Sequence, residues 1–209
     1  MRYLLIALLL FIGCESTTNS TDRYSEYNKK VAQEIESGKR IDDIFLGFKF
    51  SFTEKETNKH WKKLLEEDRI YLDDKNSYCY DFILGKNDWQ NAVANFQTEY
   101  YEDKLYKLNL KIRKKELLID DTELNQSGLL ASISLLYVRK YTSENNIRPI
   151  EVINILNKEE LYFIDGNKEV KIYPTYSGEV NVTYTDLIQL QKIKLKEKNE
   201  EDLKIRTCT

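Results

Sequence analysis

Residues Leu105-Tyr106-Lys107-Leu108-Asn109-Leu110-Lys111-Ile112 form the clearest period-two run in the chain. Apolar side chains at the even positions (Tyr106, Leu108, Leu110 and Ile112) alternate with Lys107, Asn109 and Lys111. Such alternation is typical of a strand with one face in the core and the other in water. A second run, 92–100, precedes it across Tyr101-Glu102-Asp103, a turn of hairpin length. The sequence therefore predicts a β-hairpin around which the rest of the chain is arranged.

Other segments extend this pattern on both sides of the hairpin. We expect further strands at 44–50, 78–84, 161–164, 169–173 and 180–184, and helices at 22–37, 53–68, 122–141 and from 186 onward. Thr53 and Glu56 have the spacing of a capping box, in which each side chain accepts a free amide of the first helical turn. Asp165-Gly166 predicts a tight hairpin turn. The segment 150–156 is apolar and fits either a short helix or a strand.

This order of elements predicts an α+β fold, an antiparallel sheet with helices packed on one face. The body spans 23–185, and 186–209 form a charged C-terminal helix and tail. Within the body, 53–112 and 122–184 each read as a helix followed by three strands. The two blocks could be a tandem αβββ repeat, because Tyr80-Asp81-Phe82-Ile83-Leu84-Gly85 loosely echoes Leu161-Tyr162-Phe163-Ile164-Asp165-Gly166.

The N-terminus has the pattern of a targeting signal. A positive start is followed by the apolar run 4–12, which is shorter than the roughly 20 residues of a membrane span. The run ends in Phe11-Ile12-Gly13-Cys14, which resembles the lipobox of bacterial lipoproteins, with Phe11 where that family usually has Leu. The resemblance implies that residues 1–13 are removed as a signal peptide and that Cys14 is lipidated, which attaches the protein to a membrane. Residues 14–22 are polar and read as a flexible tether. An ordinary signal peptide, or a buried helix of a cytosolic protein, are the alternatives.

Two further resemblances point to the cell envelope. Leu46-Gly47-Phe48-Lys49-Phe50-Ser51-Phe52-Thr53 is similar to the opening of envelope lipoproteins of the SmpA/BamE type, with Ser51 where that family has Gly. The whole chain resembles uncharacterised lipoproteins of Bacteroidota. Neither family supplies a catalytic residue. Glu15-Ser16 lacks the Asp that retains lipoproteins at the inner membrane of enteric bacteria, which favours an outer-membrane anchor facing the periplasm.

The amino-acid composition disfavours one class of binding partner and favours others. The net charge is −3 and Lys and Glu are scattered without a basic block, so a nucleic-acid partner is disfavoured. There are 15 Tyr among 209 residues, and Tyr favours strands and interfaces. Of the 3 Cys, Cys79 and Cys208 could form a disulfide in an oxidising envelope or remain free thiols.

The search for chemistry finds no catalytic residue, metal site or cofactor motif. His60 is the only histidine and reads as structural, and the pairs Asp42-Asp43, Asp73-Asp74 and Asp120-Asp121 lie where turns are expected. The aromatic residues Tyr78, Tyr80, Phe82, Phe96, Tyr100, Tyr101 and Tyr106 form either an exposed sheet face or part of the core. We therefore expect a lipid-anchored envelope protein that acts by non-catalytic contact with other envelope proteins. The alternative is an envelope enzyme that acts on glycan through paired carboxylates.

Overall fold

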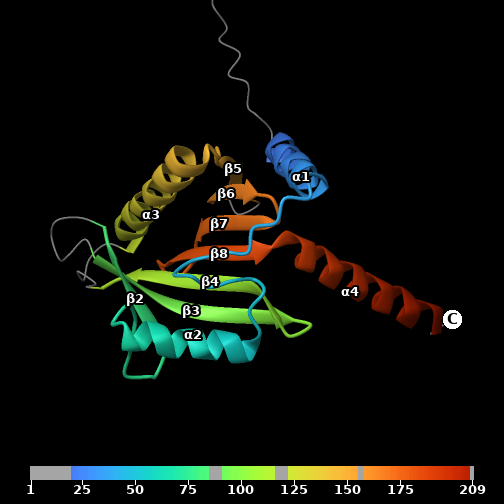
Figure 1. The fold of residues 1–209 in the computed structure, drawn as a ribbon. Helices are drawn as coiled ribbons and strands as arrows, with labels where there is room; N and C mark the ends of the chain where they lie inside the picture. Colours follow the sequence, from blue (N-terminus) through green and yellow to red (C-terminus); the bar gives the residue numbers. More distant parts are fainter. Residues whose placement is uncertain (1–19, 85–90, 116–121, 155–157, 208–209) are drawn as a thin grey trace, which may run out of the picture.

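The computed structural model describes residues 20–84, 91–115, 122–154 and 158–207. Its helices are α1 (Ser20–Glu36), α2 (Glu54–Glu66), α3 (Thr122–Asn145) and α4 (Leu187–Thr207). Its strands are β1 (Tyr71–Leu72), β2 (Tyr78–Ile83), β3 (Asn91–Tyr101), β4 (Lys104–Lys114), β5 (Ile150–Ile153), β6 (Glu159–Asp165), β7 (Lys168–Pro174) and β8 (Val180–Asp186). Every strand pairing is antiparallel, so the predicted α+β fold with an antiparallel sheet is confirmed (Figure 1).

The sheet is built from two similar halves. Its strand order is β1-β2-β3-β4-β8-β7-β6-β5, so the last strand of each half meets the other at the centre. Each half consists of a helix followed by four strands, one more than expected, because β1 and β5 add a short strand at the two outer edges. The ambiguous segment 150–156 thus contains a strand. This order fits the proposed tandem arrangement, although a common origin of the two halves stays a prediction.

The predicted hairpin of β3 and β4 is present, with one irregularity. Leu108, Leu110 and Ile112 are fully buried, as the alternation predicts. The register shifts from Glu99↔Lys107 to Tyr100↔Leu105, which leaves Tyr106 as an extra residue in a β-bulge. Leu105 is buried in place of Tyr106, whose hydroxyl donates to Glu99 (2.6 Å). The expectation that Tyr106 belongs to the apolar row was therefore wrong.

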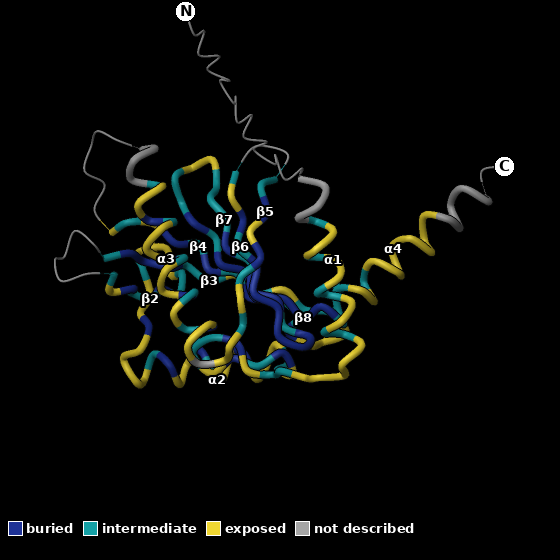
Figure 2. Tube along the Cα trace, turned by 90° about the horizontal axis from the view of Figure 1, so that it is seen from above, coloured by how far each residue is buried: buried dark blue, intermediate teal, exposed yellow. Residues whose placement is uncertain are grey.

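Helices α2 and α3 cover one face of the sheet, each over its own half. Trp61 of α2 stacks on Tyr78 of β2 and contacts Phe96 of β3. Ile133 and Tyr137 of α3 belong to the same buried cluster as β7 and β8. Figure 2 shows buried residues running along the central strands, between exposed outer surfaces. One continuous core therefore joins the two halves.

Helix α1 lies against the opposite face of the sheet. It contacts β5 and β6 and packs on Tyr162 and Ile164, whereas the alternate residue Phe163 points to the main core. The expected packing of helices on a single face thus holds for α2 and α3 and was wrong for α1. Helix α1 begins at Ser20 and not at Asp22, so residues 20–22 of the predicted tether belong to this helix.

The expected strand at 44–50 was also wrong. This segment is a turn-rich loop whose single bridge joins Asp43 to Lys49. Leu46 and Gly47 have φ angles of 53° and 82°, and the Ile44 amide donates to the Phe48 carbonyl (2.9 Å). The run is apolar because Phe48 is buried between α2 and the sheet. Its alternation reflects this core packing and not an extended backbone.

The sheet continues directly into α4. Asp186, the last residue of β8, accepts the amide of Ile188 (3.0 Å) and so satisfies the start of the helix. Leu187 joins the small core beneath α1, and the remainder of α4 extends beyond the sheet (Figure 1). Within the described residues no helix has the length and apolarity of a membrane span.

Candidate functional site

Helix α3 has apolar residues on both its inner and its outer surface. Leu129, Ile133, Tyr137 and Tyr141 are buried against the sheet. On the other side, Leu135 and Leu136 remain 51% and 37% exposed. A helix with apolar side chains around its circumference is normally covered on all sides. Its uncovered side is therefore the first candidate for a contact surface.

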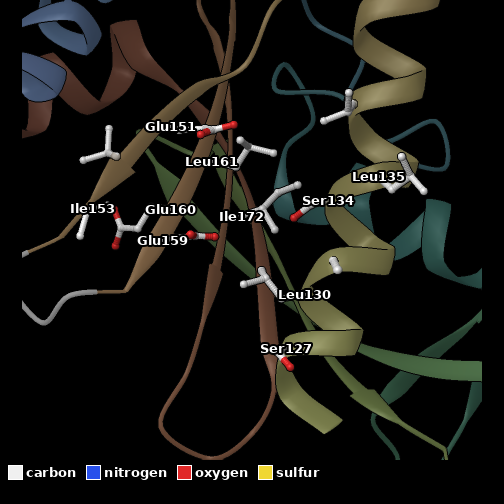
Figure 3. A pocket seen from close by; sticks show the side chains of 13 residues that line it. Ser127, Leu130, Ser134, Leu135, Glu151, Ile153, Glu159, Glu160, Leu161 and Ile172 are labelled. Carbon is white, nitrogen blue, oxygen red and sulfur yellow. The ribbon is translucent and has the colours of Figure 1, made fainter. Parts of the chain in front are cut away.

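A groove separates α3 from the strands at the β5 edge of the sheet. Its volume is about 420 Å³. Leu161 and Ile172 form its floor, and Leu130, Leu135 and Val138 of α3 form one wall (Figure 3). The groove lies where α3 packs mainly on β7 and β8, whereas its contact with β6 includes Tyr141 near the C-terminal end of the helix, which stacks on Phe163. It is an open apolar channel of the size that accommodates a few side chains.

The opposite wall of the groove is acidic. Glu151 of β5 pairs with Leu161, and Glu159 of β6 pairs with Ile153, so both carboxyl groups belong to the same sheet face as Leu161. Figure 3 shows both side chains on the groove side of their strands. Both residues are exposed, and neither forms an ion pair with a cation of the described residues. The groove therefore has an apolar floor and a negative rim.

A second hollow lies on the other flank of α3, beside the end of β2. Ile83, which is 78% exposed, and Leu84 line it together with Leu135 and Leu136. Arg139 and Lys140 give this flank a positive rim. Because Leu135 lines both hollows, they form one surface across α3, which we call the α3 surface.

A separate cluster of carboxyl groups lies beneath α1. The hydroxyl of Tyr27 donates to Glu169 (2.5 Å), and that of Tyr162 donates to Glu160 (2.5 Å). Lys171 forms an ion pair with Glu160 (2.9 Å). Burial raises the pKa of Glu169 above its ordinary value. The pKa of Glu160 is lowered, because hydrogen bonds from Tyr162, Asn154 and Lys171 outweigh the effect of its burial.

This cluster holds α1 in place. Glu169 is 6% exposed and Glu160 is 8% exposed, and the donors around them come from α1 and the sheet itself. Two acids with oppositely shifted pKa values resemble the pattern expected of a glycan hydrolase. Here, however, Glu169 is held by Tyr27 of α1, and both carboxyl groups are engaged by neighbouring side chains. Their arrangement suits a buried polar attachment.

The residues singled out in the sequence are not brought together. Cys14 and Cys208 lie outside the described residues, so lipidation and the pairing of Cys79 with Cys208 stay predictions. Cys79 is a buried thiol on β2 that accepts the Asn95 amide (3.1 Å). Burial raises its pKa, which disfavours the reactive thiolate.

His60 and the aspartate pairs have structural contacts. His60 Nε2 lies 2.9 Å from the Leu46 carbonyl, and its ring packs against Phe48. Asp42 accepts the Ser51 amide (2.7 Å) and Asp73 accepts the Ser77 amide (2.8 Å), as expected of turn aspartates. The pair at 120–121 lies outside the described residues. No cluster of three metal-ligating side chains occurs in the part of the chain that the structure describes.

The aromatic series does not form an exposed sheet face. Phe82 is buried, and Tyr78, Tyr80, Phe96 and Tyr100 pack against the main core. The alternative interpretation, that one set of these residues is core, is correct. Sequence reasoning placed α3 in the core and so missed its outer surface. One feature of the sequence could have indicated this outer surface. Leu135 does not share the helix face formed by Leu129, Ile133 and Tyr137.

Comparison with known proteins adds no assignment to this surface, since no family model, curated protein or solved structure matches the chain.

Proposed function

We propose that this chain is a lipid-anchored envelope protein that acts by non-catalytic protein–protein contact, with the α3 surface as the contact site. The lipobox-like residues 11–14 support the envelope location, and lipidated Cys14 would attach the body to the membrane. The body beyond the tether then presents a binding surface. Other envelope proteins are the partners to which such an anchored body has access.

The exposure of Leu135 carries the proposal. Leu135 is 51% exposed near the middle of α3, on the side of the helix that faces away from the core. A hollow lies on each side of this residue. Exposed apolar side chains that are contiguous and bordered by charge are typical of protein contact sites. The negative rim on one flank and the positive rim on the other give the surface a defined orientation for a partner.

The alternative, an envelope enzyme that acts on glycan through paired carboxylates, has its nearest match in Glu160 and Glu169. A hydrolase needs such carboxyl groups on both sides of a bond that the substrate can bring between them. Both are buried and hydrogen-bonded to tyrosines, Glu169 to Tyr27 of α1 and Glu160 to Tyr162. The cluster therefore gives this alternative less support than the α3 surface gives binding.

The test is site-specific photocrosslinking in the cells that make the protein. A photoreactive side chain at Leu135 should give a discrete higher-mass adduct with an envelope protein. The matched control carries the same group at Lys62, an exposed residue of α2 on another surface. Adducts at Leu135 and not at Lys62 are expected. Absence of an adduct at Leu135, or equal adducts at both positions, contradicts the proposal.

A further inference from the structure

Strand β5 leaves its outer backbone edge without a strand partner among the described residues. It is the last strand of the sheet and pairs only with β6. The Asn154 amide donates inward to the Lys158 carbonyl (3.0 Å). Because inward and outward groups alternate along an antiparallel strand, the amides and carbonyls of Glu151 and Ile153 point to the free edge, while those of Val152 point to β6.

The same two residues border the groove. Side chains of Glu151 and Ile153 lie on the face that carries Leu161 and Ile172. A chain added beside β5 would therefore extend the sheet and could turn every second side chain toward the apolar space next to α3. The other edge of the sheet is less suited to such an addition, because β1 has only 2 residues.

The negative charge of the groove rim indicates which charge a bound segment should carry. Glu151 and Glu159 are exposed and form no ion pair with a described cation. The nearby Lys158 is engaged elsewhere, since its ammonium group contacts the Thr175 carbonyl (3.3 Å) and lies over the Tyr176 ring. An occupant with Lys or Arg two positions from an apolar residue, and so on the same side of an added strand, would supply the missing positive charge.

We infer that the groove between α3 and β5 binds an extended segment of a partner protein, in which the alternate residues that face the groove include both apolar residues and Lys or Arg. The segment pairs with Glu151 and Ile153 as an added strand, places apolar side chains against Leu161 and Leu135, and directs its cations to Glu151 and Glu159. This inference rests on the proposed binding function and assigns its partner a conformation and a charge.

The test uses the full chain in detergent and short fluorescent peptides as probes. In one peptide, Val and Lys take turns at every second position, the positions that face the groove, and Thr fills the positions between them. A second carries Glu in place of Lys, and a third has the Lys sequence with N-methylated backbone amides, which cannot pair as a strand. The Lys peptide should raise the fluorescence anisotropy and the other two should not. Equal binding of the N-methylated peptide, or no binding of the Lys peptide, overturns the inference.

Charge reversal in the protein gives the complementary test. Glu151→Lys with Glu159→Lys should weaken binding of the Lys peptide about tenfold, as expected for the loss of two exposed ion pairs, and should favour the Glu peptide. The control is Glu66→Lys with Asp74→Lys, which changes exposed acids far from the groove and should leave the affinity unchanged. An equal effect of both pairs of substitutions overturns the assignment of the rim.

Residue-resolved amide exchange measured by NMR reports the strand itself. The amides of Glu151 and Ile153 should exchange quickly in the free protein and slowly with the Lys peptide, while Val152 is protected in both states. Unchanged exchange at Glu151 overturns strand addition. If Leu135 crosslinks to a partner but the peptide does not bind, this inference fails and the proposed function stands. If neither occurs, both fail.

Discussion

At the level of single residues, the most informative group is the carboxyl of Glu169. It is buried between α1 and the sheet, and burial raises its pKa above the ordinary value of 4.5. Its partner, the Tyr27 hydroxyl, lowers that pKa by donating a hydrogen bond to the ionised form. The protonation of one side chain therefore affects how firmly α1 is attached.

The sign of the pH effect follows from linkage. Because the folded state holds the Glu169 proton more tightly than the unfolded state, its stabilising contribution is complete below about pH 4.5 and is lost as the pH rises through the raised pKa. Glu169→Gln should remove this loss, since its amide oxygen still accepts the Tyr27 hydroxyl. Tyr27→Phe should extend the loss to higher pH. Urea unfolding followed by tryptophan fluorescence across this range tests both, and superimposable pH profiles for the two variants contradict the assignment.

Glu160 should show the opposite dependence. Its pKa is lowered, so its contribution to stability is present above about pH 4.5 and is lost as the pH falls through the lowered pKa. The two residues are both glutamates, nine positions apart in the sequence. Sequence reasoning could not separate them, because the difference arises from which hydroxyls, amides and cations surround each one after folding.

Gly166 is a second residue whose role is set by its surroundings. It has a φ of 58° in the β6–β7 turn, and an added Cβ would lie 2.4 Å from the Lys39 carbonyl oxygen. The Asp-Gly pair predicted the turn. The sequence could not predict that the segment after α1 would pass close to Gly166.

Gly166→Ala should destabilise the fold more than Gly178→Ala. Gly178 has a φ of 82° and open space around it, so alanine there incurs only the cost of the left-handed backbone, about 1–2 kcal/mol. At Gly166 the collision with the Lys39 backbone adds to that cost. Equilibrium unfolding of the two variants measures the difference, and an equal loss would show that the chain after α1 can move away.

At the level of elements, short sequence motifs correctly predicted the features that depend on neighbouring residues, such as helix caps and hairpin turns. The capping box at the start of α2 is present, with the Glu56 amide donating to Thr53 Oγ1 (3.2 Å). The β3–β4 hairpin and the Gly166 turn were also predicted correctly. The segment 44–50 was not, because apolar residues that fill a core from a loop can alternate like those of a strand. The groove was missed because it depends on how far α3 reaches across the sheet.

The two sides of α3 should respond differently to truncation. Ile133 is fully buried, so Ile133→Ala should lower the free energy of unfolding by about 2–5 kcal/mol. Leu135→Ala, on the outer side, should change it by about 0.5 kcal/mol or less. Denaturant titrations of both variants provide the measurement. A large loss for Leu135→Ala would mean that this side chain serves the fold and not a partner.

At the level of the whole molecule, the proposed lipid anchor at Cys14 makes a testable prediction about location. Cys14→Ala should leave the chain unprocessed and without lipid, whereas Cys79→Ala should still be lipidated. Mass spectrometry of the N-terminal peptide and fractionation of membranes test this. A bare Cys14 in the wild-type protein would refute the lipoprotein interpretation while leaving the α3 surface open to test.

The meeting of β4 and β8 at the centre of the sheet has a consequence for folding. Each half is a run of hairpins that can form from neighbouring segments, but the central pairing joins β4 and β8, which are separated in the chain by α3 and β5 to β7. During synthesis, the finished first half must keep the edge of β4 unpaired until β8 emerges. Helix α1, made first, must also wait for β5 and β6 before it can dock. This order of events predicts that β4 and β8 pair slowly and late in folding. Until then, the unpaired edge of β4 must be protected from pairing with other chains.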